Sequence, residues 1–236
     1  GLFAVFELGL LNLKSHLIDN LDRVGGQCAE LYPEKPIYDI PAYPKITGQE
    51  LTDKLIDQIK PFEPTYHLNQ QADSIEKIDE GWKIITSEGT SIIARCIVIA
   101  AGAGSFVPRK PPIDNISEFE NTSVFYAVRD KKLFKDKKIL IVGGGDSALD
   151  WTNDLSTIAN VTLMHRRKEF RAAPDSVNKM LNLEKEGKIK FLNGQLKSLN
   201  GKNKIIKEIK YSHEEKEYSI EADYLLPFFG LKMELG

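Results

Sequence analysis

The sequence of 236 residues contains only two cysteines, Cys28 and Cys96, which lie too far apart to form a CxxC pair. This excludes a zinc ribbon and a dithiol redox motif within the sequence, and so few cysteines are typical of a reducing, cytoplasmic environment. No apolar run approaches the roughly 20 residues that a membrane-spanning helix needs. With 32 basic and 34 acidic residues, the overall charge favours neither a nucleic acid nor a membrane as a partner.

Side chains for acid–base or nucleophilic catalysis are also scarce. The four histidines, His16, His67, His165 and His213, stand at predicted strand ends or in loops, with no paired acid or serine to suggest a triad. A lone cysteine such as Cys28 is more often a packing residue than a nucleophile. The sequence therefore predicts no catalytic side chain and no metal site, so that any redox chemistry has to come from bound cofactors.

A glycine-rich turn stands between a strand and a helix in the second half of the sequence. The β-branched run Lys138–Val142 predicts a strand buried on both faces, and a helix is predicted after the turn, through about Thr157. The turn reads Gly143-Gly144-Gly145-Asp146-Ser147-Ala148 and fits G-x-G-x-x-A. Its first glycine permits the tight turn, its second lets a phosphate approach the backbone, and Ala148 allows close helix–strand packing. The pattern predicts dinucleotide binding, with a purely structural turn as the alternative.

Arginines follow the next predicted strand, Val161–His165, in the stretch HRRKEFR. An acid at this point would accept hydrogen bonds from a ribose hydroxyl, whereas the guanidinium groups of Arg166, Arg167 and Arg171 suit a 2′-phosphate. The stretch therefore predicts NADP rather than NAD. A solvated basic surface or a small nucleic-acid patch is the alternative, and the balanced net charge speaks against nucleic acid.

The first half of the sequence repeats this order of strand, glycine turn, helix and strand, but lacks the first strand and most of the glycine turn. An apolar helix at residues 1–11 precedes a strand that ends at Asp19, a helix at 47–59, a hairpin around Glu88-Gly89 and a buried strand, Cys96–Ala101. The second half continues with a helix at 173–187, a strand at 189–192, a meander of 204–212 and 218–220, and a buried strand at 224–230. Each half thus predicts an α/β fold with a parallel sheet and an added β-meander.

Counting along the two halves places Asp19 and Arg166 in the same structural slot. Ala148 holds the third small-residue position of the motif, and Arg166 lies 18 residues later; Gly1 would hold that position in the first half, with Asp19 also 18 residues later. Asp19 would then accept a hydrogen bond from a ribose, as in the adenosine part of FAD, although a loop-capping aspartate fits equally well. The missing first strand indicates a fragment, or a variant in which something else fills that place.

Five stretches together resemble the thioredoxin-reductase-type ferredoxin–NADP reductases: GLFAVFELG, GGQCAELYPEKPIYDIPAYPKI, GAGSFVPRK, GGGDSALDW and HRRKEFRA. The resemblance implies two Rossmann-like dinucleotide-binding domains, each a parallel sheet with a β-meander. It divides the sequence into an FAD-binding domain at 1–106 that lacks its first strand and C-terminal part, an NADP-binding domain at 107–229, and the start of a return to the FAD domain at 230–236. Because its first strand is missing, the FAD domain is expected to bind FAD poorly.

The resemblance also implies cofactors, partners and contact residues. Hydride would pass between NADP(H) and FAD, with single electrons exchanged with ferredoxin or flavodoxin, in a homodimer that has no nucleic-acid or membrane partner. The matching FAD contacts are Asp19, Gln27, Tyr32, Ala72 and Phe106. The matching NADP contacts are Gly143, Gly145, Asp146, Ser147, Ala148, Arg166, Arg167 and Arg171. A thioredoxin or disulfide reductase, disfavoured by the missing CxxC, and a non-catalytic NADP-binding remnant are the alternatives.

Overall fold

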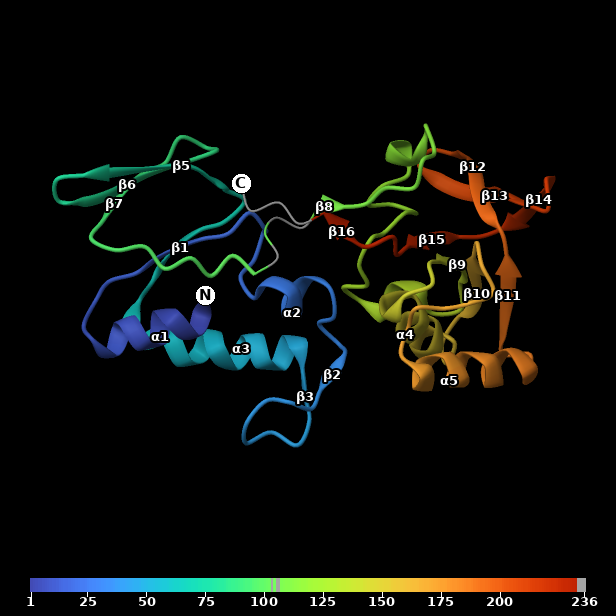
Figure 1. The fold of residues 1–236 in the computed structure, drawn as a ribbon, viewed down its shortest axis with the longest axis horizontal. Helices are drawn as coiled ribbons and strands as arrows, with labels where there is room; N and C mark the ends of the chain where they lie inside the picture. Colours follow the sequence, from blue (N-terminus) through green and yellow to red (C-terminus); the bar gives the residue numbers. More distant parts are fainter. Residues whose placement is uncertain (103, 105–106, 233–236) are drawn as a thin grey trace. The chain divides into compact units, whose positions relative to one another are not determined.

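The computed structural model describes residues 1–102, 104 and 107–232 and divides the chain into two compact units (Figure 1). Unit 1 begins at Gly1 and ends at Val107, and unit 2 begins at Pro108 and ends at Lys232. Each unit contains parallel strands, helices and an antiparallel meander, which confirms the predicted α/β class. None of the helices in these ranges is long and apolar enough to cross a membrane.

Unit 2 is built on a four-stranded parallel sheet in the order β11–β10–β9–β15. Its strands are β9 (Lys138–Val142), β10 (Asn160–His165), β11 (Ile189–Asn193) and β15 (Tyr224–Pro227). Its helices are α4 (Asp146–Leu155) and α5 (Pro174–Lys185), preceded by the 3-10 turns η2 (Ile116–Glu118) and η3 (Lys131–Phe134). A short ribbon pairs β8 (Val107–Pro108) with β16 (Leu231–Lys232). Because the four strands of the sheet are parallel, their carboxyl ends meet at one edge, where ligands of such sheets bind.

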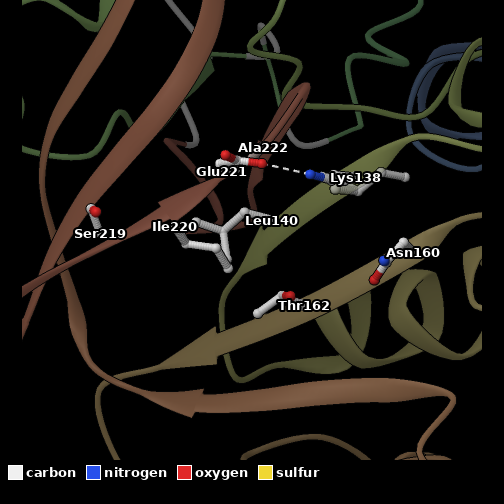
Figure 2. A pocket seen from close by; sticks show the side chains of 9 residues that line it. Lys138, Leu140, Asn160, Thr162, Ser219, Ile220, Glu221 and Ala222 are labelled. Carbon is white, nitrogen blue, oxygen red and sulfur yellow. Dashed lines mark hydrogen bonds and ion pairs between the residues drawn. The ribbon is translucent and has the colours of Figure 1, made fainter.

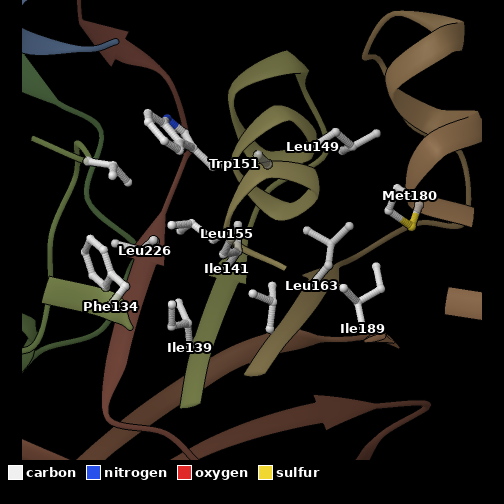
Figure 3. Packing of buried hydrophobic residues seen from close by; sticks show 13 residues of the cluster. Phe134, Ile139, Ile141, Leu149, Trp151, Leu155, Leu163, Met180, Ile189 and Leu226 are labelled. Carbon is white, nitrogen blue, oxygen red and sulfur yellow. The ribbon is translucent and has the colours of Figure 1, made fainter. Parts of the chain in front are cut away.

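One face of this sheet is buried under the two helices. Ile141 of β9 and Leu163 of β10 pack with Leu149 and Leu155 of α4 and with Met180 of α5, in the cluster that Figure 3 shows. All five side chains are fully buried, and each contributes about 1.5–3 kcal/mol by leaving water. This packing holds α4 against β9 and β10 directly beyond the glycine turn.

A meander covers the opposite face of the sheet. It consists of β12 (Gln195–Lys202), β13 (Ile205–His213) and β14 (Lys216–Glu221), paired antiparallel in that order. Leu140 and Met164 of the sheet share a buried cluster with Leu199 of β12 and Ile209 of β13. The sequence predicted β13 and β14 but missed β12, because only two leucines interrupt its polar residues and give no clear alternation.

Unit 1 holds two parallel strands, β1 (His16–Ile18) and β4 (Thr65–His67), beside the packed helices α1 (Leu2–Leu10) and α3 (Gly48–Ile59). Its other elements are α2 (Gly26–Glu30), the paired β2 (Pro36–Ile37) and β3 (Ile46–Thr47), the 3-10 turn η1 (Lys60–Phe62) and a meander of β5 (Ala72–Ile78), β6 (Gly81–Thr86) and β7 (Ser91–Ala94). A capping box starts α3: Thr47 Oγ1 accepts the N–H of Glu50, and the Glu50 carboxylate accepts the N–H of Thr47. The predicted helix at 47–59 is confirmed.

The predicted buried strand Cys96–Ala101 is wrong. These residues form no strand, and the side chains of Val98 and Ile99 are 54% and 81% exposed. A strand buried on both faces of a parallel sheet needs a hydrogen-bonded neighbour and a covering layer. Within the described ranges no strand pairs with residues 96–101, so their apolar composition alone does not bury them.

Replacing Leu163 with alanine is expected to lower the free energy of unfolding of unit 2 by about 2–5 kcal/mol, because the lost side chain leaves a cavity in the helix-facing cluster. Leu133→Ala is the matched control, since this side chain is 42% exposed and its loss should change stability by about 0.5 kcal/mol or less. Urea unfolding followed by the fluorescence of Trp151, in a Trp82→Phe background, gives both values. Equal losses of unfolding free energy in Leu163→Ala and Leu133→Ala would contradict the burial of Leu163 in the helix-facing cluster.

Candidate functional site

The glycine turn lies at the carboxyl edge of the unit 2 sheet, between β9 and α4. A Cβ on Gly143 would lie 2.8 Å from the Cβ of Ala148, and a Cβ on Gly144 would overlap the ring of His165. A Cβ on Gly145 would meet nothing within 4 Å. Packing therefore requires glycine at the first two positions, while Gly145 borders the open space that a backbone–phosphate contact needs.

The first turn of α4 has no side-chain cap for its backbone N–H groups. Gly145 precedes the helix, Asp146 and Ser147 are exposed, and Ala148 is buried against the strand. The Asp146 carboxylate accepts the N–H of Ala173 at 2.7 Å, which ties the loop after β10 to the turn. Uncapped N–H groups and the positive end of the helix dipole together favour an anion here.

The loop after β10 presents the three predicted arginines beside the turn. Arg171 donates its backbone N–H to the carbonyl oxygen of Gly144 at 2.7 Å, a second tie between loop and turn. The side chains of Arg166, Arg167 and Arg171 are exposed. None of them forms an ion pair with a carboxylate in the part of the chain that the structure describes. The positive charge of the loop is thus available to an anionic ligand.

His165 lies against the turn, and its ring stacks on that of Phe170 with 5.5 Å between the centroids. Burial lowers the pKa of His165, and the neighbouring charges of Arg166 and Arg167 lower it further, with a backbone hydrogen bond as the opposing effect. The imidazole is therefore neutral at pH 7. His165 therefore adds no positive charge to that of the arginines.

The sheet ladders correct the count that put Asp19 and Arg166 in one slot. Asp19 donates its N–H to the carbonyl of His67, at the end of β4, and His165 accepts the N–H of Gly194, just after β11. Asp19 and His165 thus both turn their backbone groups toward the next parallel strand along the chain. Successive residues of a strand alternate in the neighbouring strand toward which their backbone N–H and C=O groups point. Asp19 therefore corresponds to His165, and Arg166 follows one residue later.

The offset arises between the glycine motif and the strand end. Asp19 lies 18 residues after Gly1, whereas His165 lies 17 residues after Ala148. The same distance counted from the motif therefore ends one residue later in unit 2, at Arg166. As a result, a neutral imidazole holds the slot of the ribose-binding acid, with Arg166 directly after it.

Asp19 in unit 1 has one oxygen engaged and one free. Its Oδ1 accepts the N–H of Leu21 at 3.1 Å, the loop-capping role that the sequence left open, and Oδ2 has no hydrogen bond among the described residues. Burial raises the pKa of Asp19, and the bond from Leu21 opposes this. Gln70 donates its N–H to the carbonyl of Asp19 at 3.1 Å, so Ala72, the first residue of β5, begins close by.

Gln27 and Tyr32, in and just after α2, are half-buried. The Nε2 of Gln27 is 3.9 Å from where a Cβ on Gly102 would stand. Burial raises the pKa of Tyr32, and Cys28 raises it further. A shallow groove of about 340 Å³ is lined by Tyr32, Lys35, Pro36, Ile37, Tyr38 and Asp39.

Phe106, the remaining predicted FAD contact, lies outside the described residues. The described part of unit 1 thus offers an amide and aromatic surface that fit a flat ligand, but holds no counterpart of the glycine turn.

A pocket of about 360 Å³ lies at the amino ends of β9 and β10, away from the glycine turn (Figure 2). It is lined by Lys138, Ile139, Leu140, Asn160, Thr162, Ser219, Ile220, Glu221 and Ala222. Lys138 and Glu221 form an exposed ion pair at 2.6 Å. No predicted contact residue lies here, and parallel sheets bind their ligands at the carboxyl ends of the strands. The glycine turn, and not this pocket, is therefore the candidate nucleotide site.

The strand order, glycine turn and arginine loop have a match among known families. The model of the pyridine nucleotide-disulphide oxidoreductase family covers residues 1–235. The chain belongs to this family. Its members are oxidoreductases, so the enzyme class predicted from the sequence is confirmed.

Family members named ferredoxin–NADP reductase are similar to the whole chain. One from Bradyrhizobium sp. (strain BTAi1) is 55% identical, and one from Nitrobacter hamburgensis is 54% identical. Each comparison spans all of this chain and 70% of the relative's length. The family resemblance found in the sequence motifs is confirmed.

Solved structures of thioredoxin reductases share the fold. The Lactococcus lactis enzyme has a TM-score of 0.77 at 26% identity, over 98% of this chain and 74% of that one. The T. acidophilum enzyme has a TM-score of 0.78 at 21% identity, over 98% of this chain and 73% of that one. Fold likeness at such identities does not carry an activity, and this sequence has no CxxC.

Gly143→Ala is expected to lower the free energy of unfolding by about 1–3 kcal/mol, because its methyl group would crowd Ala148 and the backbone at Phe228. Gly145→Ala is the matched control: its methyl group enters open space, so stability should change by about 0.5 kcal/mol or less. Urea unfolding followed by Trp151 fluorescence, with Trp82 replaced by phenylalanine, measures both. A loss in Gly145→Ala as large as in Gly143→Ala would show that this space is filled.

Proposed function

We propose that this chain is a ferredoxin–NADP reductase that binds NADP(H) on unit 2 and FAD on unit 1 and exchanges electrons with ferredoxin or flavodoxin. The proposal rests on one observation: the arginine loop is tied to the glycine turn, and none of its three arginine side chains is paired to a carboxylate in the described residues. The names of the relatives at 55% and 54% identity support the same activity. A bound flavin supplies the change between hydride transfer and single-electron transfer.

In unit 2, the backbone around Gly145 and the first N–H groups of α4 would hold the pyrophosphate. Arg166, Arg167 and Arg171 would bind the 2′-phosphate through charge-assisted hydrogen bonds worth about 1.5–3 kcal/mol each. Asp146 accepts the N–H of Ala173 through Oδ1 and so positions the loop, and it stays a predicted NADP contact. Ser147 and Ala148 complete the turn, and His165, a histidine where an acid would bind a ribose, carries no negative charge that would repel the phosphate.

In unit 1, the free Oδ2 of Asp19 would accept a hydrogen bond from the ribose of FAD. Gln27 and Tyr32 would contact the flavin, with Ala72 and Phe106 as further contacts taken from the family resemblance. The assignment of residues 1–106 to FAD and 107–229 to NADP belongs to this proposal. Homodimer formation and a cytoplasmic location stay predictions from the sequence.

A thioredoxin or disulfide reductase is not favoured. Such an enzyme needs a dithiol to relay electrons, and the sequence holds two distant cysteines without a CxxC. The relatives described above are named for ferredoxin and NADP. A non-catalytic NADP-binding remnant, the other alternative, differs in having no reductase activity.

Because weak FAD binding is expected from the sequence, the chain is assayed with an excess of FAD, and it is expected to reduce ferredoxin with NADPH in strong preference to NADH. Replacing Arg166 and Arg171 together with glutamine should lower kcat/KM for NADPH by roughly 10–100-fold or more, because charge-assisted bonds to the 2′-phosphate are lost, and leave kcat/KM for NADH unchanged. Lys168→Gln, an exposed cation of the same loop, is the control and should change either value by no more than about threefold. Steady-state kinetics with both nucleotides measure this.

The possible results of these assays distinguish the proposed reductase from the two alternative functions. Equal use of NADH and NADPH by the unmodified chain would contradict the role of the arginines. Binding of NADP⁺ without flavin uptake and without reduction of any acceptor would identify a non-catalytic module. Rapid NADPH-dependent reduction of thioredoxin, with none of ferredoxin, would favour the disulfide-reductase class.

A further inference from the structure

Two histidines that are distant in the sequence meet on the parallel strands of unit 1. His16 begins β1 and His67 ends β4, and the ladder pairs His16 with Thr65 and Ile18 with His67. The two histidines are therefore diagonal neighbours on one face of the strands. The contact joins His16 Nδ1 to His67 Nε2 at 2.9 Å.

The two imidazole rings meet edge to edge. Their planes differ by only 15°, and their centroids, 5.2 Å apart, lie farther from each other than the two nitrogens at 2.9 Å. The nitrogens therefore point into the same narrow gap. In the neutral pair one of them carries a proton and donates to the lone pair of the other.

The separation of the two nitrogens can be compared with that of two histidine ligands of one metal ion. Imidazole nitrogens bind divalent ions at about 2.0–2.1 Å, so two of them at a right angle around an ion are about 2.9 Å apart, and two at a tetrahedral angle about 3.3 Å apart. The observed 2.9 Å between His16 Nδ1 and His67 Nε2 is that of an N–H···N hydrogen bond between rings that face each other, and both rings have to turn before their nitrogens bind an ion at the same separation. Right-angled nitrogen ligands are typical of square-planar or octahedral Ni²⁺ and Cu²⁺.

We propose that His16 and His67 form a two-histidine site for a divalent transition-metal ion of the Ni²⁺ or Cu²⁺ type. Each ring turns so that its nitrogen faces the ion, and the proton between the rings moves to the other nitrogen of its own ring, so that both imidazoles bind in the neutral form. Water completes the coordination. The site belongs to unit 1, where it adjoins the proposed FAD contact Asp19, whose N–H is bonded to the carbonyl of His67; the proposal itself does not require FAD to bind.

The surroundings of the pair fit reversible binding rather than a structural ion. His16 is exposed and His67 is half-buried. Leu17, between His16 and Ile18, packs with the buried residues of α1 and α3, so the helices cover the opposite face of β1. In the part of the chain that the structure describes, no group of three or more histidine, cysteine, aspartate or glutamate side chains gathers around an ion. Two protein ligands and solvent therefore make up the site.

Titration of the chain with NiCl₂ at pH 7.5 in a calorimeter tests the proposal. One equivalent should bind, and His16→Gln and His67→Gln should each weaken the affinity by roughly tenfold or more, because either change removes one of the two ligands. His213→Gln is the control and should have no effect, since His213 lies in β13 of unit 2. Circular dichroism checks that each variant is folded.

Equal affinities for all four proteins, or a loss in only one of the two unit 1 variants, would overturn a two-histidine site. Electron paramagnetic resonance of the unmodified chain with one equivalent of Cu²⁺ gives a second readout that needs no variant. Splitting from two equatorial nitrogens is expected, and that splitting should be absent from the double variant His16→Gln/His67→Gln. Splitting from one nitrogen or none would contradict the proposal.

Discussion

The close approach of backbone and side chains at the glycine turn governs the carboxyl edge of unit 2. Gly144 can lie against the ring of His165 only because it has no Cβ, and Gly143 allows α4 to begin directly on the sheet. This contact lets the Gly144 carbonyl accept the N–H of Arg171. The position of the arginines beside the uncapped helix is thus a consequence of two absent side chains. Gly145 differs, because the space beside it is open.

The two units share one arrangement and differ in the chemistry at one strand end. In unit 1 the slot holds Asp19, whose free oxygen suits a ribose hydroxyl; in unit 2 it holds His165, a neutral ring kept uncharged by burial and by Arg166. The segment between the motif and the strand end is one residue longer in unit 1, which hides this correspondence from a simple count. Unit 1 has a carboxylate in this position, and unit 2 has exposed guanidinium groups directly after it. This difference would select different nucleotides in the two units.

The sequence predicts correctly the elements that depend on interactions between residues close together in the chain. The glycine turn with its flanking strand and helix, and the helix that Thr47 caps, follow from short-range rules. Cys96–Ala101 has the same apolar character as Lys138–Val142, yet among the described residues only Lys138–Val142 has neighbouring strands, and no local pattern contains that information. Contacts between residues far apart in the chain were missed for the same reason. The histidine pair of unit 1 joins residues 51 positions apart and needs the register of a parallel ladder to be seen.

The claim that a 2′-phosphate is what the arginine loop recognises can be measured on unit 2 directly, without flavin or electron transfer. Adenosine 2′,5′-bisphosphate and adenosine 5′-monophosphate differ only by that phosphate, and both can be titrated into ¹⁵N-labelled protein. The bisphosphate should bind at least roughly tenfold more tightly, and it should shift the amide signals of Gly145 and Ser147 and the guanidinium signal of Arg166. Equal affinities, or shifts confined to the pocket around Lys138 and Glu221, would contradict the account.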